Sequence, residues 1–155
     1  MEKKFMDRAI ELAHSGMKHN EGGPFGCVIV KNGTIIAEGN NRVTANNDPT
    51  AHAEINAIRN ACKTLNDFQL KDCDIYTSCE PCPMCLGAIY WARPKSVYYA
   101  ATREDAAKAG FDDDFIYKEL DLPPRERSIP MIYAEQKNAL ELFEKWLLKE
   151  DKIEY

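Results

Sequence analysis

Four residues in two short segments could hold a metal ion and activate water. His52 and Glu54 lie two positions apart, and Cys82 and Cys85 flank a Pro-Met pair further along the chain. A structural zinc site closes with four protein ligands, whereas a catalytic site keeps one position open for water. His52, Cys82 and Cys85 make three ligands, and Glu54 is a candidate general base, because zinc lowers the pKa of its water from 15.7 toward about 7. The pattern predicts a hydrolytic zinc site.

Two helix starts are expected to position these residues. Residues 48–50, Asp-Pro-Thr, supply turn and capping chemistry before a helix predicted over 51–65. Pro83 suits the first turn of a second helix, over 83–92, which would place both cysteines on one face. Because helix N-termini favour anions, this placement would lower the thiol pKa values and help balance the metal charge.

Cys79 adds a third thiol at the same spacing and leaves two other interpretations open. Cys79, Cys82 and Cys85 resemble part of an iron–sulfur cluster motif, although the fourth cysteine of that motif is missing. Alternatively, Cys79 could be the fourth ligand of a closed structural zinc site. Neither interpretation gives Glu54 a role.

Composition and charge indicate an ordinary globular protein that does not bind nucleic acid. With 155 residues, 45% hydrophobic and 29% charged, the chain is expected to form a single domain over 1–155. Its net charge of −5 argues against a nucleic-acid substrate, since phosphate binding depends on clustered Lys and Arg. We expect no signal peptide and no membrane-spanning run. Six cysteines with metal-like spacing indicate a reducing cytoplasm.

Hydrophobic periodicity predicts an alternation of helices and strands. Asn32-Gly33, between two strand-like runs, is the strongest short signal for a hairpin. Strand–helix–strand order implies parallel pairing, with the ligands at strand C-terminal ends and helix starts. The fold predicted is α/β, a three-layer α-β-α sandwich with a central mixed sheet. The expected helices are 2–18, 51–65, 83–92, 104–120 with a break at Gly110, and 134–149; the expected strands are 25–31, 34–39, 74–78, 96–101 and 129–133.

The motifs and their order resemble the cytidine-deaminase-like superfamily, and more closely its short bacterial-type guanine deaminases. The zinc pattern, H-x-E followed by P-C-x-x-C, is the one used by zinc-dependent base deaminases, including cytosine and tRNA adenosine deaminases. The similarity covers essentially the whole chain, and residues 110–119 and the Tyr155 terminus are what point to guanine. The segments that carry it are 22–26, 46–54, 77–94 and 110–119.

The resemblance implies hydrolytic deamination of guanine to xanthine and ammonia, with one Zn2+ per chain held by the three ligands above and Glu54 as the catalytic proton carrier. It places Asn41 and Asp113 in the pocket as partners of the base, with Phe25 and Trp91 as its walls. Without the resemblance, Asn41 would be taken for the end of a strand and Asp113 for a helix cap. Phe25 and Trp91 would then be core residues.

The resemblance also implies a homodimer in which a C-terminal segment, residues 134–155, is exchanged between subunits. Tyr155 would then lie over the pocket of the partner subunit, although fraying is the usual expectation for such a charged tail. The expected partners are a small purine base and a second copy of this chain, without nucleic acid or membrane. Two other hypotheses remain: a cytosine or tRNA adenosine deaminase, and a zinc-stabilised binding protein without catalytic activity.

Overall fold

A mixed four-stranded sheet forms the framework of the protein. The computed structural model describes residues 1–155, with strands β1 (Gly26–Lys31), β2 (Thr34–Asn40), β3 (Cys73–Cys79) and β4 (Ser96–Ala101) in the order β2-β1-β3-β4. β1 pairs antiparallel with both β2 and β3, while β3 and β4 run parallel. Asn32 and Gly33 both have positive φ, 51° and 74°, which confirms the predicted tight hairpin between β1 and β2.

The helices form near the predicted positions. Gly110, with φ of 91°, separates α5 from α6, as the predicted break requires. The four-residue α2 was not predicted, because a single turn is too short to show helical periodicity. None of the helices combines the length and the apolar character needed to cross a bilayer. The helices are α1 (Lys3–Lys18), α2 (Val43–Asn46), α3 (Ala53–Leu65), α4 (Pro83–Ala92), α5 (Arg103–Lys108), α6 (Asp114–Asp121) and α7 (Lys137–Leu148), with a 3-10 turn η1 (Pro124–Glu126).

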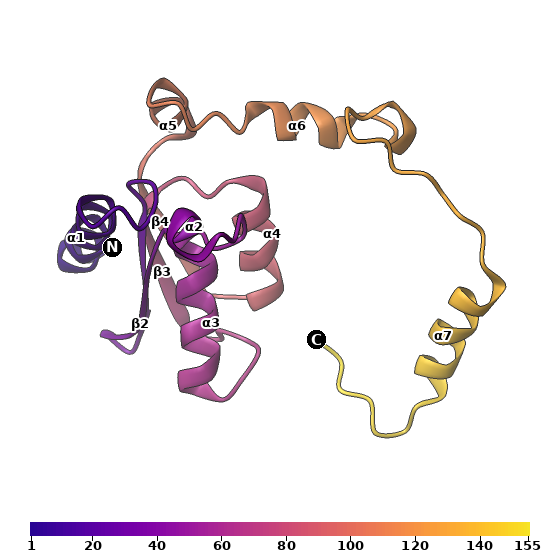
Figure 1. Cartoon of the computed structure of the whole chain (residues 1–155). Helices are drawn as coiled ribbons and strands as arrows, with labels where there is room; N and C mark the ends of the chain where they lie inside the picture. Colours follow the sequence, from indigo (N-terminus) through magenta and orange to yellow (C-terminus); the bar gives the residue numbers. More distant parts are fainter. The chain divides into compact units, whose positions relative to one another are not determined.

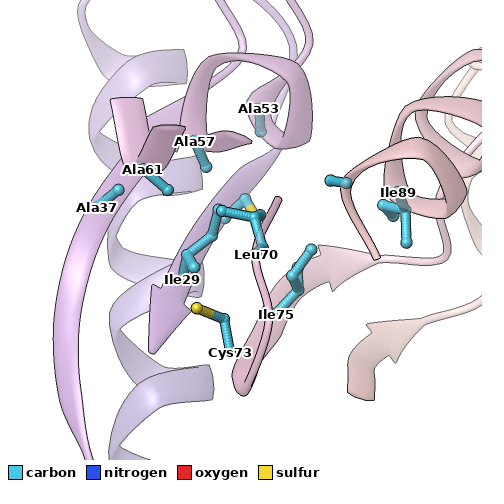
Figure 2. Close-up of a cluster of buried hydrophobic side chains, with 11 residues drawn as sticks. Ile29, Ala37, Ala53, Ala57, Ala61, Leu70, Cys73, Ile75 and Ile89 are labelled. Carbon is cyan, nitrogen blue, oxygen red and sulfur yellow. The ribbon is translucent and has the colours of Figure 1, made fainter. Parts of the chain in front are cut away.

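Helices cover both faces of the sheet, which confirms the three-layer prediction (Figure 1). On one face, Phe5 and Met6 of α1 pack against Val28 and Tyr76. On the other face, a larger apolar cluster joins the sheet to α3 and α4 (Figure 2). Each strand of the sheet centre therefore has both faces buried, and its polar residues can be tolerated only where they find partners.

Helix α3 approaches the sheet unusually closely. Ala53, Ala57 and Ala61 are fully buried along one side of the helix and face the cluster in Figure 2. Opposite them, a Cβ atom added at Gly39 would lie 2.5 Å from the Ala53 carbonyl oxygen and 2.6 Å from the Ala57 nitrogen. Only glycine fits at this point of β2, so small side chains on both elements set the height of α3 above the sheet.

The chain divides into two compact units, residues 1–114 and residues 115–155. The second unit contains α7 and has no buried residue, so it has no hydrophobic core of its own. The single domain over 1–155 therefore stays a prediction. The predicted strand at 129–133 is wrong for the single chain, where these residues have no regular structure. A strand requires a neighbouring edge with which to exchange backbone hydrogen bonds, and no strand pairs with this segment.

Candidate active site

The N-termini of α3 and α4 place the three candidate ligands. His52 is the N-cap residue of α3, and Cys82 is the N-cap residue of α4, both with extended backbone conformations. Before α3, Asp48 Oδ1 accepts hydrogen bonds from the Thr50 nitrogen and hydroxyl, at 2.8 and 2.7 Å, and forms the predicted turn. Cys85 lies one turn into α4 and is fully buried. The predicted convergence of two helix starts is thus present.

The three ligand atoms have the spacing of a tetrahedral zinc site. His52 Nδ1 lies 3.5 Å from the sulfur of Cys82 and 3.5 Å from the sulfur of Cys85. All three atoms lie within 4.8 Å of one another. Zinc bonds of about 2.0–2.1 Å to nitrogen and about 2.3 Å to sulfur, at the tetrahedral angle, would separate those atoms by about 3.5 Å. The two nitrogen–sulfur distances therefore match those expected around a zinc ion.

The local electrostatics prepare one thiol for metal binding. The hydrogen bond with Cys85, helped by that with His52, lowers the pKa of Cys82 to about 4. The same hydrogen bond and burial raise the pKa of Cys85 well above its usual value. Cys82 is consequently a thiolate at neutral pH, which is the form that binds a metal.

Cys79 lies outside this cluster, which removes the support for both rival interpretations of the cysteines. It is not among the residues whose ligand atoms come together. Its thiol is 3.5 Å from the carbonyl oxygen of Thr102, and burial raises its pKa to about 11. A buried neutral thiol with another partner is neither a fourth zinc ligand nor part of an iron–sulfur motif.

Glu54 is buried directly beside the cluster, with only 5% of its surface exposed. One carboxylate oxygen, Oε1, accepts a hydrogen bond of 2.7 Å from the Thr77 hydroxyl, and the other, Oε2, lies 3.4 Å from the Cys85 sulfur. Burial raises the pKa of Glu54, and the hydrogen bond from Thr77 opposes that shift. A carboxylate here faces both the metal position and the cavity described next.

A cavity of about 370 Å³ opens over Glu54 within the first unit. Phe25 forms part of its wall, and the Phe111 ring meets the Phe25 ring edge-on, with centroids 4.9 Å apart and an interplanar angle of 85°. The cavity's acidic residues, Glu54 included, outnumber its single arginine. The residues that line it are Gly23, Phe25, Asn41, Val43, Thr44, His52, Glu54, Cys79, Glu80, Cys82, Arg103, Ala106, Gly110, Phe111, Asp112 and Asp113.

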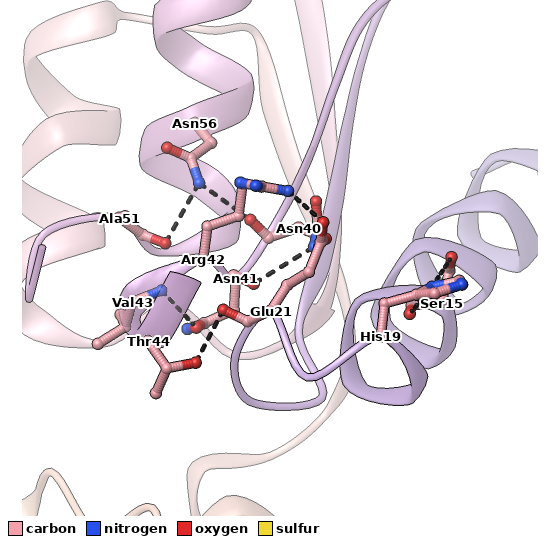
Figure 3. Close-up of polar contacts among 10 residues, drawn as sticks. All are labelled: Ser15, His19, Glu21, Asn40, Asn41, Arg42, Val43, Thr44, Ala51 and Asn56. Carbon is pink, nitrogen blue, oxygen red and sulfur yellow. Dashed lines mark hydrogen bonds and ion pairs between the residues drawn. The ribbon is translucent and has the colours of Figure 1, made fainter. Parts of the chain in front are cut away.

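Asn41 presents an amide donor to this cavity. Its side-chain oxygen already accepts hydrogen bonds from the backbone nitrogens of Gly23 and Val43, each at 3.2 Å. Figure 3 shows the bond from Val43. The residue is 5% exposed, so its free capacity is the NH2 group. Asp113 also lines the cavity, and burial, followed by the charge of Cys82, raises the pKa of its carboxyl.

The remaining predicted pocket residues are Trp91 and Tyr155. Trp91 does not line the cavity and is 62% exposed. It follows Cys85 by six residues, which carries it about 9 Å along α4 and onto another face of the helix. Tyr155 belongs to the second unit, so its placement over a pocket stays a prediction.

Sequence reasoning missed several residues of the site. Thr77 is the partner of Glu54, and Glu80, Arg103 and Phe111 line the cavity. Phe111 belongs to the segment 110–119 that carries the family resemblance, but nothing in its spacing marks it as a wall. Thr77 could have been found as the polar residue on an otherwise apolar strand face, where a buried hydroxyl requires a partner.

Comparison with known proteins identifies the family. Residues 1–101 match the family model described as the cytidine and deoxycytidylate deaminase zinc-binding region. This chain belongs to that family. Zinc is accordingly its cofactor, and the single cluster of His52, Cys82 and Cys85 is compatible with one ion per chain.

Individual deaminases are similar over different lengths of the chain. The guanine deaminase of Bacillus subtilis strain 168 is 61% identical over 151 residues, which cover 97% of each chain. An X-ray structure of guanine deaminase from Bacillus subtilis, 59% identical, superposes with a TM-score of 0.97 over 100% of this chain and 99% of that one. The tRNA-specific adenosine deaminase of Agrobacterium fabrum is 44% identical over 97 residues, 63% of each chain. The likeness to guanine deaminases extends beyond the zinc-binding region.

We expect the Cys85→Ala variant to lose its zinc, because two remaining ligands cannot hold the ion against solvent. The Cys79→Ala variant is the matched control and should keep one zinc per chain, since its sulfur lies outside the cluster. Elemental analysis of the purified variants measures both. Zinc loss in Cys79→Ala would restore the closed structural site as an interpretation.

Proposed function

We propose that the protein catalyses the hydrolytic deamination of guanine to xanthine and ammonia. The observation that carries this proposal is a buried carboxylate, Glu54, placed between a three-ligand metal cluster and a cavity of about 370 Å³. A structural site would have no use for that carboxylate. The 61% identity to a guanine deaminase over nearly the whole chain supports guanine as the base.

In this proposal His52, Cys82 and Cys85 hold the zinc, and Glu54 carries the protons. Zinc, when bound, lowers the pKa of a water molecule from 15.7 toward about 7. Glu54 accepts the proton of that water as oxygen adds to C2 of guanine, the carbon that bears the amine. Glu54 passes that proton to ring nitrogen N3 and then carries the remaining proton of the added oxygen to the departing amine, so that water and guanine give xanthine and ammonia.

Asn41 recognises the far edge of the base. When C2 of guanine lies at the metal, the opposite edge presents the acceptors O6 and N7. The Asn41 amide oxygen is occupied by two backbone N–H groups, so its NH2 group is the part that faces a ligand, and it matches those acceptors. A base that carries an amino group in place of O6 would direct a hydrogen-bond donor at the NH2 donor of Asn41. Asp113 accepts hydrogen bonds from the N1 and N2 donors, and Phe25 provides an apolar wall.

The alternative functions are less well supported. A tRNA substrate would bring phosphates toward a cavity lined by Glu80, Asp112 and Asp113, on a chain of net charge −5. The cavity volume lies near the lower end of the range for small-molecule sites. Cytosine has no N7 and no fused ring to reach an Asn41 donor across the pocket. The hypothesis of a zinc-stabilised binding protein gives the buried carboxylate of Glu54 no role.

We also propose that two chains exchange residues 134–155 and form a homodimer. Apolar side chains on the second unit support this, because they lack a cover within the single chain and a stable helix needs one. Exchange of an identical element between protomers is a low-cost route to a symmetric dimer. Tyr155 of one chain would then close the pocket of the other. The exposed apolar residues of the second unit include Phe115, Ile129, Met131, Ile132, Tyr133, Leu140, Phe143, Leu147 and Leu148.

We infer that the protein works in the cytoplasm. The proposed zinc ligands include two thiols, and a reducing compartment keeps thiols available for metal binding. All six cysteines are free thiols in the structure, which is consistent with that compartment.

Ammonia release from guanine, adenine, cytosine and guanosine, measured side by side, tests the proposed reaction. We expect turnover of guanine alone, with xanthine as product. The Glu54→Ala variant should keep its zinc but lose about 10⁴-fold or more of its turnover, because one group carries several protons. A variant that retains a tenth of the wild-type rate would remove Glu54 from the mechanism, and preferred turnover of another base would overturn guanine.

The Asn41→Asp variant tests base recognition. An aspartate keeps an oxygen for the two backbone N–H groups but replaces the NH2 donor with an acceptor. We expect kcat/KM for guanine to fall about 100-fold, or about 2.7 kcal/mol, with the thermal midpoint nearly unchanged. Asn60→Asp, on the exposed side of α3, is the control, and its kcat/KM for guanine should stay within about two-fold of the wild-type value. A collapse of stability with normal activity per folded molecule would show that Asn41 only ends a strand.

Deletion of residues 151–155 tests the exchanged tail. We expect a strong loss of activity with unchanged zinc content and circular dichroism, because a lid excludes water and strengthens the hydrogen bonds to the base. Sedimentation of the full chain should give a dimer. An active monomer at micromolar concentration, or a fully active truncation, would show that the tail is an ordinary frayed terminus and not a lid.

A further inference from the structure

Thr77 is a polar side chain on an apolar face of the sheet. It lies on β3, in register with Cys27 of β1, and on the same face as Ile75, which packs against α3 and α4. Only 1% of its surface is exposed. Valine has the same shape and would bury without a hydrogen-bond requirement, so the hydroxyl at this position needs a reason.

The hydroxyl has one partner, and that partner is Glu54. The distance from Thr77 Oγ1 to Glu54 Oε1 is 2.7 Å, in the range of a charge-assisted hydrogen bond. Because an ionised carboxylate has no proton to give, Thr77 is the donor. The bond joins strand β3 of the sheet to the first turn of α3, where Glu54 lies.

This bond makes the two oxygens of Glu54 unequal. Oε1 accepts a hydrogen bond from the hydroxyl on the sheet, whereas Oε2 accepts one from the thiol of Cys85, at 3.4 Å, on the side of the metal ligands. A glutamate has three side-chain torsions, and a free carboxylate in an enclosed site could rotate either oxygen toward the cavity. Anchoring Oε1 removes that rotation.

We propose that Thr77 is a positioning residue for Glu54, holding Oε1 so that Oε2 alone exchanges protons with water and base. This inference rests on the proposed deamination. It assigns Thr77 no contact with the base: its effect passes through the geometry of Glu54, and small misplacements of a catalytic group carry large rate penalties.

The test compares Thr77→Val and Thr77→Ser in the zinc-loaded full chain. We expect Thr77→Val to lower kcat by about 10- to 100-fold while KM for guanine stays within about two-fold, because the base contacts are intact. Thr77→Ser keeps the hydroxyl and should recover most of kcat. Thr64→Val is the matched control: it removes an exposed hydroxyl that donates to the Asn60 carbonyl at 3.0 Å, and should leave both constants unchanged.

Two further measurements separate positioning from packing. Zinc content should remain one per chain in all variants, and a crystal structure of Thr77→Val should show Glu54 in more than one rotamer. Equal kcat for the Val and Ser variants, or a single unchanged Glu54 rotamer in Thr77→Val, would overturn the proposal. Wild-type protein that releases no ammonia from guanine would instead overturn the proposed function, while the rotamer comparison would still decide the role of Thr77.

Discussion

The close packing of α3 on the sheet determines where the reactive groups lie. The alanines along α3 and the glycine opposite them at position 39 let the helix backbone approach the strands. At that height the first turn of α3 brings Glu54 within hydrogen-bond reach of β3, and its N-cap residue His52 reaches the start of α4. A larger side chain at the contact would move the carboxylate, the imidazole and the thiols relative to one another. The geometry of the site therefore depends on the packing of small residues.

The same packing creates an electrostatic balance in a largely buried space. A carboxylate and two thiols lie together there, and each would be costly to ionise alone in a medium from which water is excluded. Helix N-termini, the imidazole of His52 and the hydroxyl of Thr77 offset part of that cost. A divalent cation held by deprotonated thiols would balance their charge and stabilise the site.

The metal cluster and the cavity wall draw on different lengths of the chain. The family model covers residues 1–101, which include all three candidate ligands and Glu54. Part of the cavity wall lies beyond that limit, from Arg103 to Asp113. The tRNA-specific adenosine deaminase of Agrobacterium fabrum is similar over 63% of the chain, while a guanine deaminase is similar over 97% of it. The segment after β4 thus contributes cavity-lining residues that lie beyond the family model.

The sequence alone predicted the candidate metal ligands, the candidate general base, the hairpin and the layered fold. Those features depend on residue type and short spacing, such as a proline before a helix or Asn32-Gly33 between strands, and local chemistry fixes them. The tertiary structure decided what depends on long-range contacts. It separated Cys79 from the cluster, paired Thr77 with Glu54 and filled the oxygen of Asn41 with two backbone donors. It also left Trp91 on the surface and residues 129–133 without a strand partner. Periodicity reports which face of an element is apolar, but only the packed chain decides which element, or which second chain, lies against that face.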